Sequence, residues 1–182
     1  VGDIGDLCVL LCHKCTGMSK PNQAFFAPCP RGLEAVLRAE LEQLGAQDAT
    51  DVPGGVSFAG TFPLCYAINL NSRIASRVLW RVFHGAYRDE HDIFQAAHDL
   101  PWHEWFSARR TIKVKVSAQQ CPLKSLDFVT LRIKDAVCDR FREAAGARPD
   151  VDTSRPDIRI DAFLDRQNVT LYLDTSGEAL FK

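Results

Sequence analysis

The stretch TIKVKVS, residues 111–117, and the stretch SLDFVTLRIKDAVCDRF, residues 125–141, decide the fold of the second half of the chain. In the first stretch, branched apolar residues alternate with polar ones, which is the pattern of a strand with one buried face. Lys113 and Lys115 therefore share the solvated face of this strand. In the second stretch, apolar residues recur every three or four positions, which predicts an amphipathic helix with Ser125 as its N-cap.

Further elements flank this strand and helix. A helix is expected over about 92–99, and Gly146 ends the long helix ahead of a polar loop that contains two prolines. Runs of β-type residues at 158–164 and 169–173 predict two final strands joined by a short polar turn. The second half of the chain therefore mixes helices with strands.

The first half shows a complete supersecondary pattern. The expected elements are a strand at 24–27, a helix at 33–44, a hairpin around Gly54-Gly55, a helix at 62–70 and a strand at 77–82. This order, β-α-β-β-α-β, is that of a ferredoxin-like unit. The predicted fold class is therefore α/β or α+β, with two small lobes.

Composition places the chain among ordinary globular proteins. Of its 182 residues, 46% are hydrophobic and 25% are charged, which excludes a disordered or fibrous chain. No apolar run reaches the roughly 18 residues that a membrane span needs, so we predict a cytoplasmic protein without a membrane partner. The seven cysteines are scattered and odd in number, which favours reduced thiols over a disulfide framework.

Positive charge is concentrated between Arg109 and Arg142. This segment holds nine basic and three acidic residues, a formal charge of +6, whereas the whole chain carries −1. A basic strand face beside a helix N-terminus can hold a sugar–phosphate backbone, because the first amides of a helix attract phosphate. The alternative is a solvated helix face on which arginines pair with neighbouring aspartates. The predicted nucleic-acid site consists of Lys113, Lys115, Lys124, Ser125 and Lys134.

Motifs for self-contained catalysis are missing from the sequence. There is no P-loop, no dinucleotide-binding glycine motif, no nucleophile elbow and no H-E-x-x-H helix. We therefore predict no catalytic residue and no metal site in this chain. Two metal alternatives stay open, because thiolate and imidazole groups suit zinc. They are the group Cys8, Cys12, His13 and Cys15, and the histidines His91, His98 and His103 with their acidic neighbours.

Two further features have alternative interpretations. Cys121 lies in the basic region, where positive charge would favour a reactive thiolate, but a small buried side chain is the simpler interpretation. The aromatic residues Trp102, Trp105 and Phe106 could stack on bases. Their helical spacing instead favours apolar packing that anchors the second lobe to the first.

Several separated segments of the chain form a recognisable series. They are FFAPCPRGLE at 25–34, GGVSF at 54–58, NSRIASRVL at 71–79, LKS at 123–125, KDA at 134–136, RPDVD at 148–152, PDIRI at 156–160 and LDTSGE at 173–178. In this order they resemble bacterial THUMP-containing RNA methyltransferases, and most closely the large-subunit rRNA guanine-N2 methyltransferases. The resemblance covers about Ala24 to Lys182.

The resemblance implies a ferredoxin-like lobe at 24–64, a THUMP lobe at 65–176 and, at 177–182, the start of a linker to a covalently attached methyltransferase domain. The parent enzyme would transfer a methyl group from S-adenosylmethionine to guanine N2 of 23S rRNA. This chain would bind structured RNA rather than DNA and hold no cofactor, because the glycine and Asn/Asp-Pro-Pro-aromatic motifs of the catalytic domain are absent. Residues 1–23 are expected to be a leader, with the native start at Met18.

Two other functions are compatible with the sequence. The chain could be a free-standing THUMP adaptor that delivers RNA to a separate enzyme. It could also hydrolyse small esters through its front lobe, as some ferredoxin-like proteins do, although fold analogy supports this weakly. The loop at 28–32 offers a single arginine and no partner for such chemistry.

Overall fold

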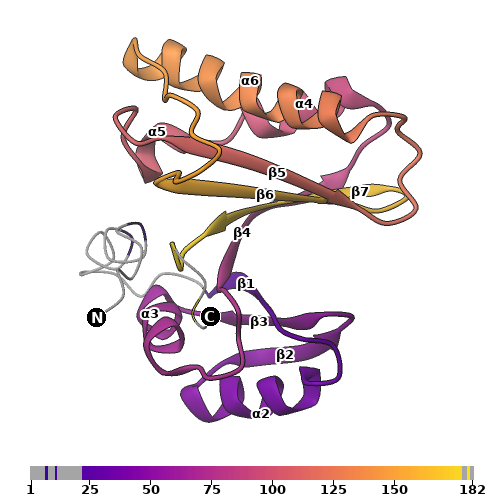
Figure 1. Ribbon diagram of the computed structural model, residues 1–182, viewed down its shortest axis with the longest axis vertical. Helices are drawn as coiled ribbons and strands as arrows, with labels where there is room; N and C mark the ends of the chain where they lie inside the picture. Colours follow the sequence, from indigo (N-terminus) through magenta and orange to yellow (C-terminus); the bar gives the residue numbers. More distant parts are fainter. Residues whose placement is uncertain (1–6, 8–10, 12–21, 178–179, 181–182) are drawn as a thin grey trace. The chain divides into compact units, whose positions relative to one another are not determined.

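The computed structural model describes residues 22–177 and the single positions Leu7, Leu11 and Leu180. These residues form two compact units: the first comprises the described positions up to Arg81 and from Asp174 onward, and the second is Val82–Leu173 (Figure 1). Helices and strands alternate in both units, as the sequence predicted. The zinc alternative of Cys8, Cys12, His13 and Cys15 lies outside the described residues. The expected leader lies outside them too, apart from Leu7, Leu11, Asn22 and Gln23.

The first unit has the predicted β-α-β-β-α-β order. Its strands pair antiparallel in the order β2-β3-β1-β4. The elements are β1 (Gln23–Pro28), α2 (Glu34–Leu44), β2 (Gln47–Val52), β3 (Gly55–Gly60), α3 (Phe62–Asn71) and the first residues of β4 (Leu79–Ala86).

Turn chemistry and aromatic packing explain this arrangement. Helix α2 ends at Gly45 with φ of +109°, and Gly54 turns the β2–β3 hairpin with φ of +84°, conformations that cost glycine little. In the core, the ring of Phe62 lies edge-on to that of Trp80, with 5.0 Å between centroids. The sequence-predicted helix end and hairpin are therefore confirmed.

Residue Glu34 holds the loop before α2 against the β2–β3 turn. Its carboxylate accepts hydrogen bonds from the backbone N–H of Gly32 at 2.7 Å and of Gly54 at 3.1 Å. Backbone hydrogen bonds, including the one from its own N–H, lower the pKa of Glu34. The family-like segment 25–34 therefore contains the end of β1, a connecting loop and the first residue of α2, and Glu34 fixes the loop through these hydrogen bonds.

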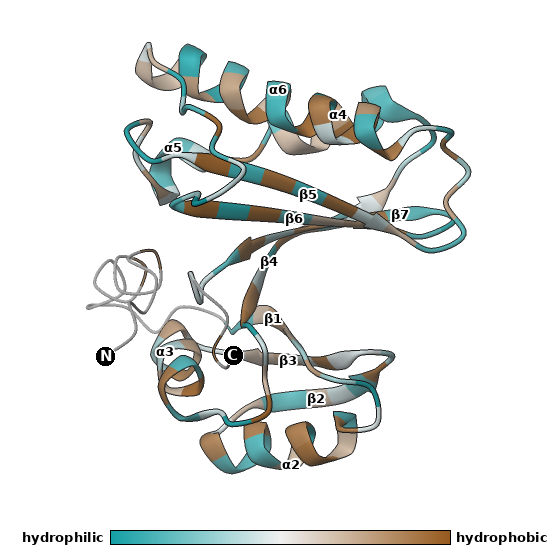
Figure 2. Ribbon diagram, viewed as in Figure 1, coloured by the Kyte–Doolittle hydropathy of each residue, from teal (hydrophilic) through white to brown (hydrophobic). Residues whose placement is uncertain are grey.

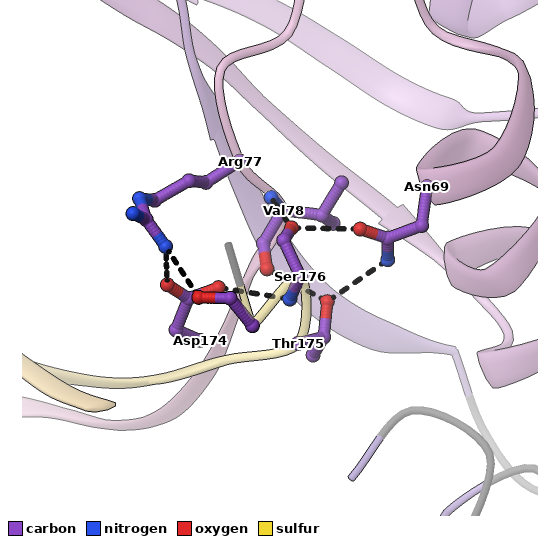
Figure 3. A network of polar contacts seen from close by, with 7 residues as sticks. Asn69, Arg77, Val78, Asp174, Thr175 and Ser176 are labelled. Carbon is purple, nitrogen blue, oxygen red and sulfur yellow. Dashed lines mark hydrogen bonds and ion pairs between the residues drawn. The ribbon is translucent and has the colours of Figure 1, made fainter. Parts of the chain in front are cut away.

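The segment Asp174–Gly177 completes the first unit through a buried polar network (Figure 3). Thr175 and Ser176 are 0% and 2% exposed. Asn69 on α3 donates to Thr175 Oγ1 over 3.1 Å and accepts from Ser176 Oγ over 2.7 Å. The backbone of Val78 donates to Ser176 Oγ at 2.8 Å and accepts from Thr175 Oγ1 at 2.7 Å. Each buried hydroxyl therefore both donates and accepts, which gives the segment one defined position.

An ion pair lies beside this network. Asp174, whose side chain is 1% exposed, pairs with Arg77, and the same guanidinium donates to the carbonyl of Gly177 at 3.0 Å. The other carboxylate oxygen of Asp174 accepts from the N–H of Ser176 at 2.8 Å. The buried charge is thus paired and hydrogen-bonded, which is the condition for tolerating it.

The second unit is a sheet covered on one face by helices. Its strand order is β4-β7-β6-β5, with β5 parallel to β6 and β6 antiparallel to β7. Besides the end of β4, the elements are α4 (Glu90–His98), α5 (Trp102–Trp105), β5 (Ile112–Ala118), α6 (Leu126–Ala145), β6 (Ile158–Leu164) and β7 (Asn168–Asp174).

Helices α4 and α6 lie side by side on the same face of this sheet (Figure 1). The core between them and the sheet contains Ile93, Val129, Ile133, Leu164 and Leu171, all of them 0% exposed. This apolar stripe is the one that the helical spacing of α6 predicted. None of the helices among the described residues combines the length and apolar character of a membrane span.

The aromatic residues before β5 pack inside the second unit. The indole N–H of Trp102 donates to the carbonyl of Ala97 over 2.7 Å, and Trp102 is 0% exposed. The ring of Phe106 lies 5.0 Å from that of Phe141 on α6. Because both side chains are buried, the base-stacking interpretation does not apply to them.

Candidate nucleic-acid interface

The β5–β6–β7 part of the second unit has two chemically different faces. Ala162, Leu164, Val169 and Leu171 point to the helices. The residues between them point the other way, and Figure 2 shows the alternation of hydrophilic and hydrophobic residues along β5 and β6. We call the face opposite α4 and α6 the open sheet face. Its residues are Lys113, Lys115, Ser117, Arg159, Asp161, Phe163, Thr170 and Tyr172.

The predicted pair Lys113 and Lys115 lies together on the open sheet face. Lys115 is exposed, whereas Lys113 is half-buried and its Nζ donates to the carbonyl of Thr153 over 2.9 Å. Asp161 pairs in register with Lys115 and is the acidic residue of this face. Lys115 therefore presents an exposed positive charge to an anionic partner, and Lys113 adds a second one beside it.

Lys124 and Ser125 lie where the chain leaves the end of β5 and enters α6. Ser125 is the N-cap, as predicted, because its Oγ accepts from the N–H of Phe128 over 3.2 Å. Lys124 is exposed. Asp127 in the first turn adds a negative charge at the same helix end. Lys124 therefore supplies the positive charge here, while Ser125 mainly stabilises the helix.

Lys134 lies apart from the other predicted residues. It is on α6, which covers the opposite side of the sheet from Lys113 and Lys115, and its Nζ is 2.8 Å from a carboxylate oxygen of Asp135. It borders a small hollow with Cys138 and Arg148. Burial raises the pKa of the Cys138 thiol, which keeps it protonated. The structure thus brings Lys113 and Lys115 together and separates Lys134 from them.

The alternative interpretation of the basic residues on α6 was that they interact with neighbouring side chains on a solvated helix face. It holds for part of the helix. Arg142 pairs with Asp139 at 3.3 Å, three residues away on the helix surface. The guanidinium of Arg132 lies over the ring of Phe94, 4.3 Å from its centroid. These two arginines are engaged within the helical layer, in agreement with their exclusion from the predicted site.

Three residues of the open sheet face were missed by sequence reasoning. Arg159 pairs in register with Lys113, Phe163 pairs with Ser117, and Tyr172 lies next to Asp161. The alternation within 158–164 shows that Arg159 and Phe163 share one face of their strand. Only the parallel pairing of β6 with β5 shows that it is the face of the two lysines.

The remaining chemical candidates form no site in the described part of the chain. His98 contacts Glu143 at 3.0 Å, and residues 22–177 hold no group of three side chains that could bind a metal. Cys121 is half-buried, and its Sγ is 3.2 Å from Tyr87 Oη. Burial and this contact raise the pKa of Tyr87, so the phenol stays neutral.

Both units correspond to known domain families. Residues 24–79 match the RlmL ferredoxin-like domain family, and residues 87–174 match the THUMP domain family. The first match coincides with the β-α-β-β-α-β unit, and the second with the α4-to-β7 part of the second unit.

A curated relative has the same two-domain region. The chain is 40% identical over 158 residues to the ribosomal RNA large subunit methyltransferase K/L of Syntrophotalea carbinolica. The aligned part is 87% of this chain and 22% of the relative, so the chain spans about a fifth of that protein's length.

Solved structures share the fold. A putative methyltransferase in complex with SAH has a TM-score of 0.77 at 24% identity, over 90% of this chain and 44% of that one. A predicted N6-adenine-specific DNA methylase from Listeria monocytogenes has a TM-score of 0.76 at 23% identity, over 87% of this chain and 42% of that one. At these identities the likeness concerns the fold alone.

Proposed function

We propose that this chain binds structured RNA for an rRNA methyltransferase. The premise is that the chain belongs to the family that joins an RlmL ferredoxin-like domain to a THUMP domain. The substrate would be large-subunit rRNA, 23S rRNA in bacteria, and the methyl group would go to guanine N2. The observation that carries this proposal is the match of residues 87–174 to the THUMP family, in the unit that presents Lys113 and Lys115.

The physical requirement of the reaction supports a separate binding region. A methyltransferase that acts on a base edge must receive the base unstacked or unpaired, so the surrounding RNA has to be held meanwhile. Ammonium groups that contact phosphates can hold RNA without reading its sequence. Lys113, Lys115 and Lys124 are suited to this task, with Ser125 as the helix cap and Lys134 as a weaker contributor.

S-adenosylmethionine is the methyl donor that we expect for the full-length family. Hollows of about 290 and about 190 Å³ lie among the described residues. Both are smaller than the roughly 300–1,000 Å³ of ordinary ligand pockets. The larger hollow is lined without a charged residue that could hold the cofactor's amino-acid or ribose groups. We therefore assign the cofactor and the methyl transfer to a separate, covalently linked domain.

Binding should depend steeply on salt. If three or four lysines contact phosphates, each contact contributes about 0.7–0.9 to the slope of log affinity against log salt. We expect the affinity for a folded 23S rRNA fragment to fall roughly 50-fold between about 50 and about 200 mM salt. Fluorescence anisotropy titrations would measure this fall. An affinity that ignores salt would contradict phosphate binding.

The methylation part of the proposal has its own test. In cells that lack the gene, nucleoside mass spectrometry of 23S rRNA should show one N2-methylguanosine fewer than in the parent strain. An unchanged level of this nucleoside would contradict the assigned reaction and leave the RNA-binding proposal standing.

A further inference from the structure

We propose that the open sheet face of the second unit binds unpaired RNA nucleotides, with a base stacked on Phe163 and the adjoining phosphates held by Lys115 and Lys113. This inference rests on the proposed function only for the statement that the partner is RNA. It adds two points: the face of the unit that binds the RNA, and the state of the bound RNA, which is single-stranded rather than paired.

The ring of Phe163 is accessible because its neighbours across the sheet are small. It pairs in register with Ser117 on β5 and with Thr170 on β7. Neither hydroxyl residue is large enough to cover an aromatic ring, and Phe163 is 37% exposed. Among the described phenylalanines, this degree of exposure is found only at Phe163 and at Phe128 on α6.

The charges around this ring suit a phosphate backbone. Lys115 precedes Ser117 by two residues on the same strand face, about 6.6 Å along the strand. Lys113 and Arg159 lie opposite each other further along, so the face carries three cations against the single anion Asp161. The Nε of Arg159 is buried and has no hydrogen-bond partner among the described residues. The face therefore combines an exposed aromatic ring with an excess of positive charge.

This combination favours unpaired RNA over a duplex. In an A-form helix the bases are stacked on one another, and a flat sheet cannot reach their faces. In a single strand each base offers a π-face, and aromatic side chains beside basic ones are the usual platform for it. A second protein packed on Phe163 would not need the lysines, so charge and ring together argue for the nucleic acid.

The test compares two exposed phenylalanines of the second unit in the full chain. Phe163→Ala removes the proposed stacking ring, and Phe128→Ala removes an even more exposed ring from the helical layer. The probes are a short unstructured RNA that carries 2-aminopurine and a blunt RNA duplex. Phe163→Ala should weaken single-strand binding about tenfold and abolish the fluorescence quenching of 2-aminopurine, and duplex binding should change by less than about twofold.

Controls separate this inference from the function on which it rests. Phe128→Ala should bind both probes like the parent chain, and Phe163→Tyr should restore the quenching. If Phe163→Ala binds and quenches as the parent does while Lys115→Glu weakens binding, the stacking site is wrong and RNA binding by the unit stands. If the parent chain binds neither probe, both proposals are wrong. Thermal unfolding of each variant confirms that the fold is retained.

Discussion

Replacing Lys113, Lys115 and Lys124 together by glutamate is expected to weaken the binding of structured RNA by at least about 100-fold at about 0.1 M salt. The change removes three phosphate contacts and places three negative charges where the backbone would lie. The salt slope should become shallower by about one for each lost contact. Anisotropy titrations at several salt concentrations would measure both quantities.

A matched variant separates local charge from total charge. Arg88, Arg142 and Arg155 are exposed arginines of the same unit, and Arg88 and Arg142 already pair with neighbouring aspartates. Their replacement by glutamate changes the net charge equally, and we expect at most about a fivefold loss from general repulsion. Equal losses in the two triple variants would show that the lysines form no specific interface.

Replacing Asn69 by alanine should destabilise the first unit by about 2–3 kcal/mol. Its amide accepts the hydroxyl proton of Ser176 and donates to Thr175, and all three side chains are buried. Truncation leaves the Ser176 hydroxyl without an acceptor in a site closed to water. Hydrogen exchange of the β1 and β3 amides should therefore accelerate by about 30–150-fold, since about 1.4 kcal/mol corresponds to a factor of ten.

Asn71 on the same helix provides the control for this variant. Its side-chain amide donates to the carbonyl of Ala67 at 2.8 Å, four residues back, as that of Asn69 does to Cys65 at 3.0 Å. Asn71 is exposed, so Asn71→Ala should cost no more than about 0.5 kcal/mol. If the two variants exchange alike, the buried network does not hold the first unit together.

Local patterns in the sequence were sufficient to predict most helices and strands of this protein, but not the short helix α5. The alternation around Lys113 and Lys115 identified β5, and the three-and-four spacing behind Ser125 identified α6 and its buried stripe. Glycine turns marked the end of α2 and the β2–β3 hairpin. These signals are readable because they depend on residues close in sequence, which decide backbone conformation and the direction of each side chain.

Local sequence patterns predicted only part of the candidate site. Lys113 and Lys115 were placed together correctly, because their alternation lies within one strand. Lys134 was grouped with them by sequence distance and charge, but α6 covers the other side of the sheet from the two lysines. Phe163 was not recognised, since an exposed phenylalanine in a strand resembles a core residue until its neighbours are known.

The amino-acid sequence by itself therefore determined the main helices and strands and which residues of each share a face, although β4 spans Leu79–Ala86 and not the predicted 77–82. The tertiary structure alone decided that β6 pairs parallel with β5, which places Phe163 and Arg159 beside the lysines, and that residues 174–177 complete the first unit through Asn69. The physical reason is the range of the interactions. Strand register and buried hydrogen bonds join residues about 40 to 100 positions apart, and no local period encodes such pairings.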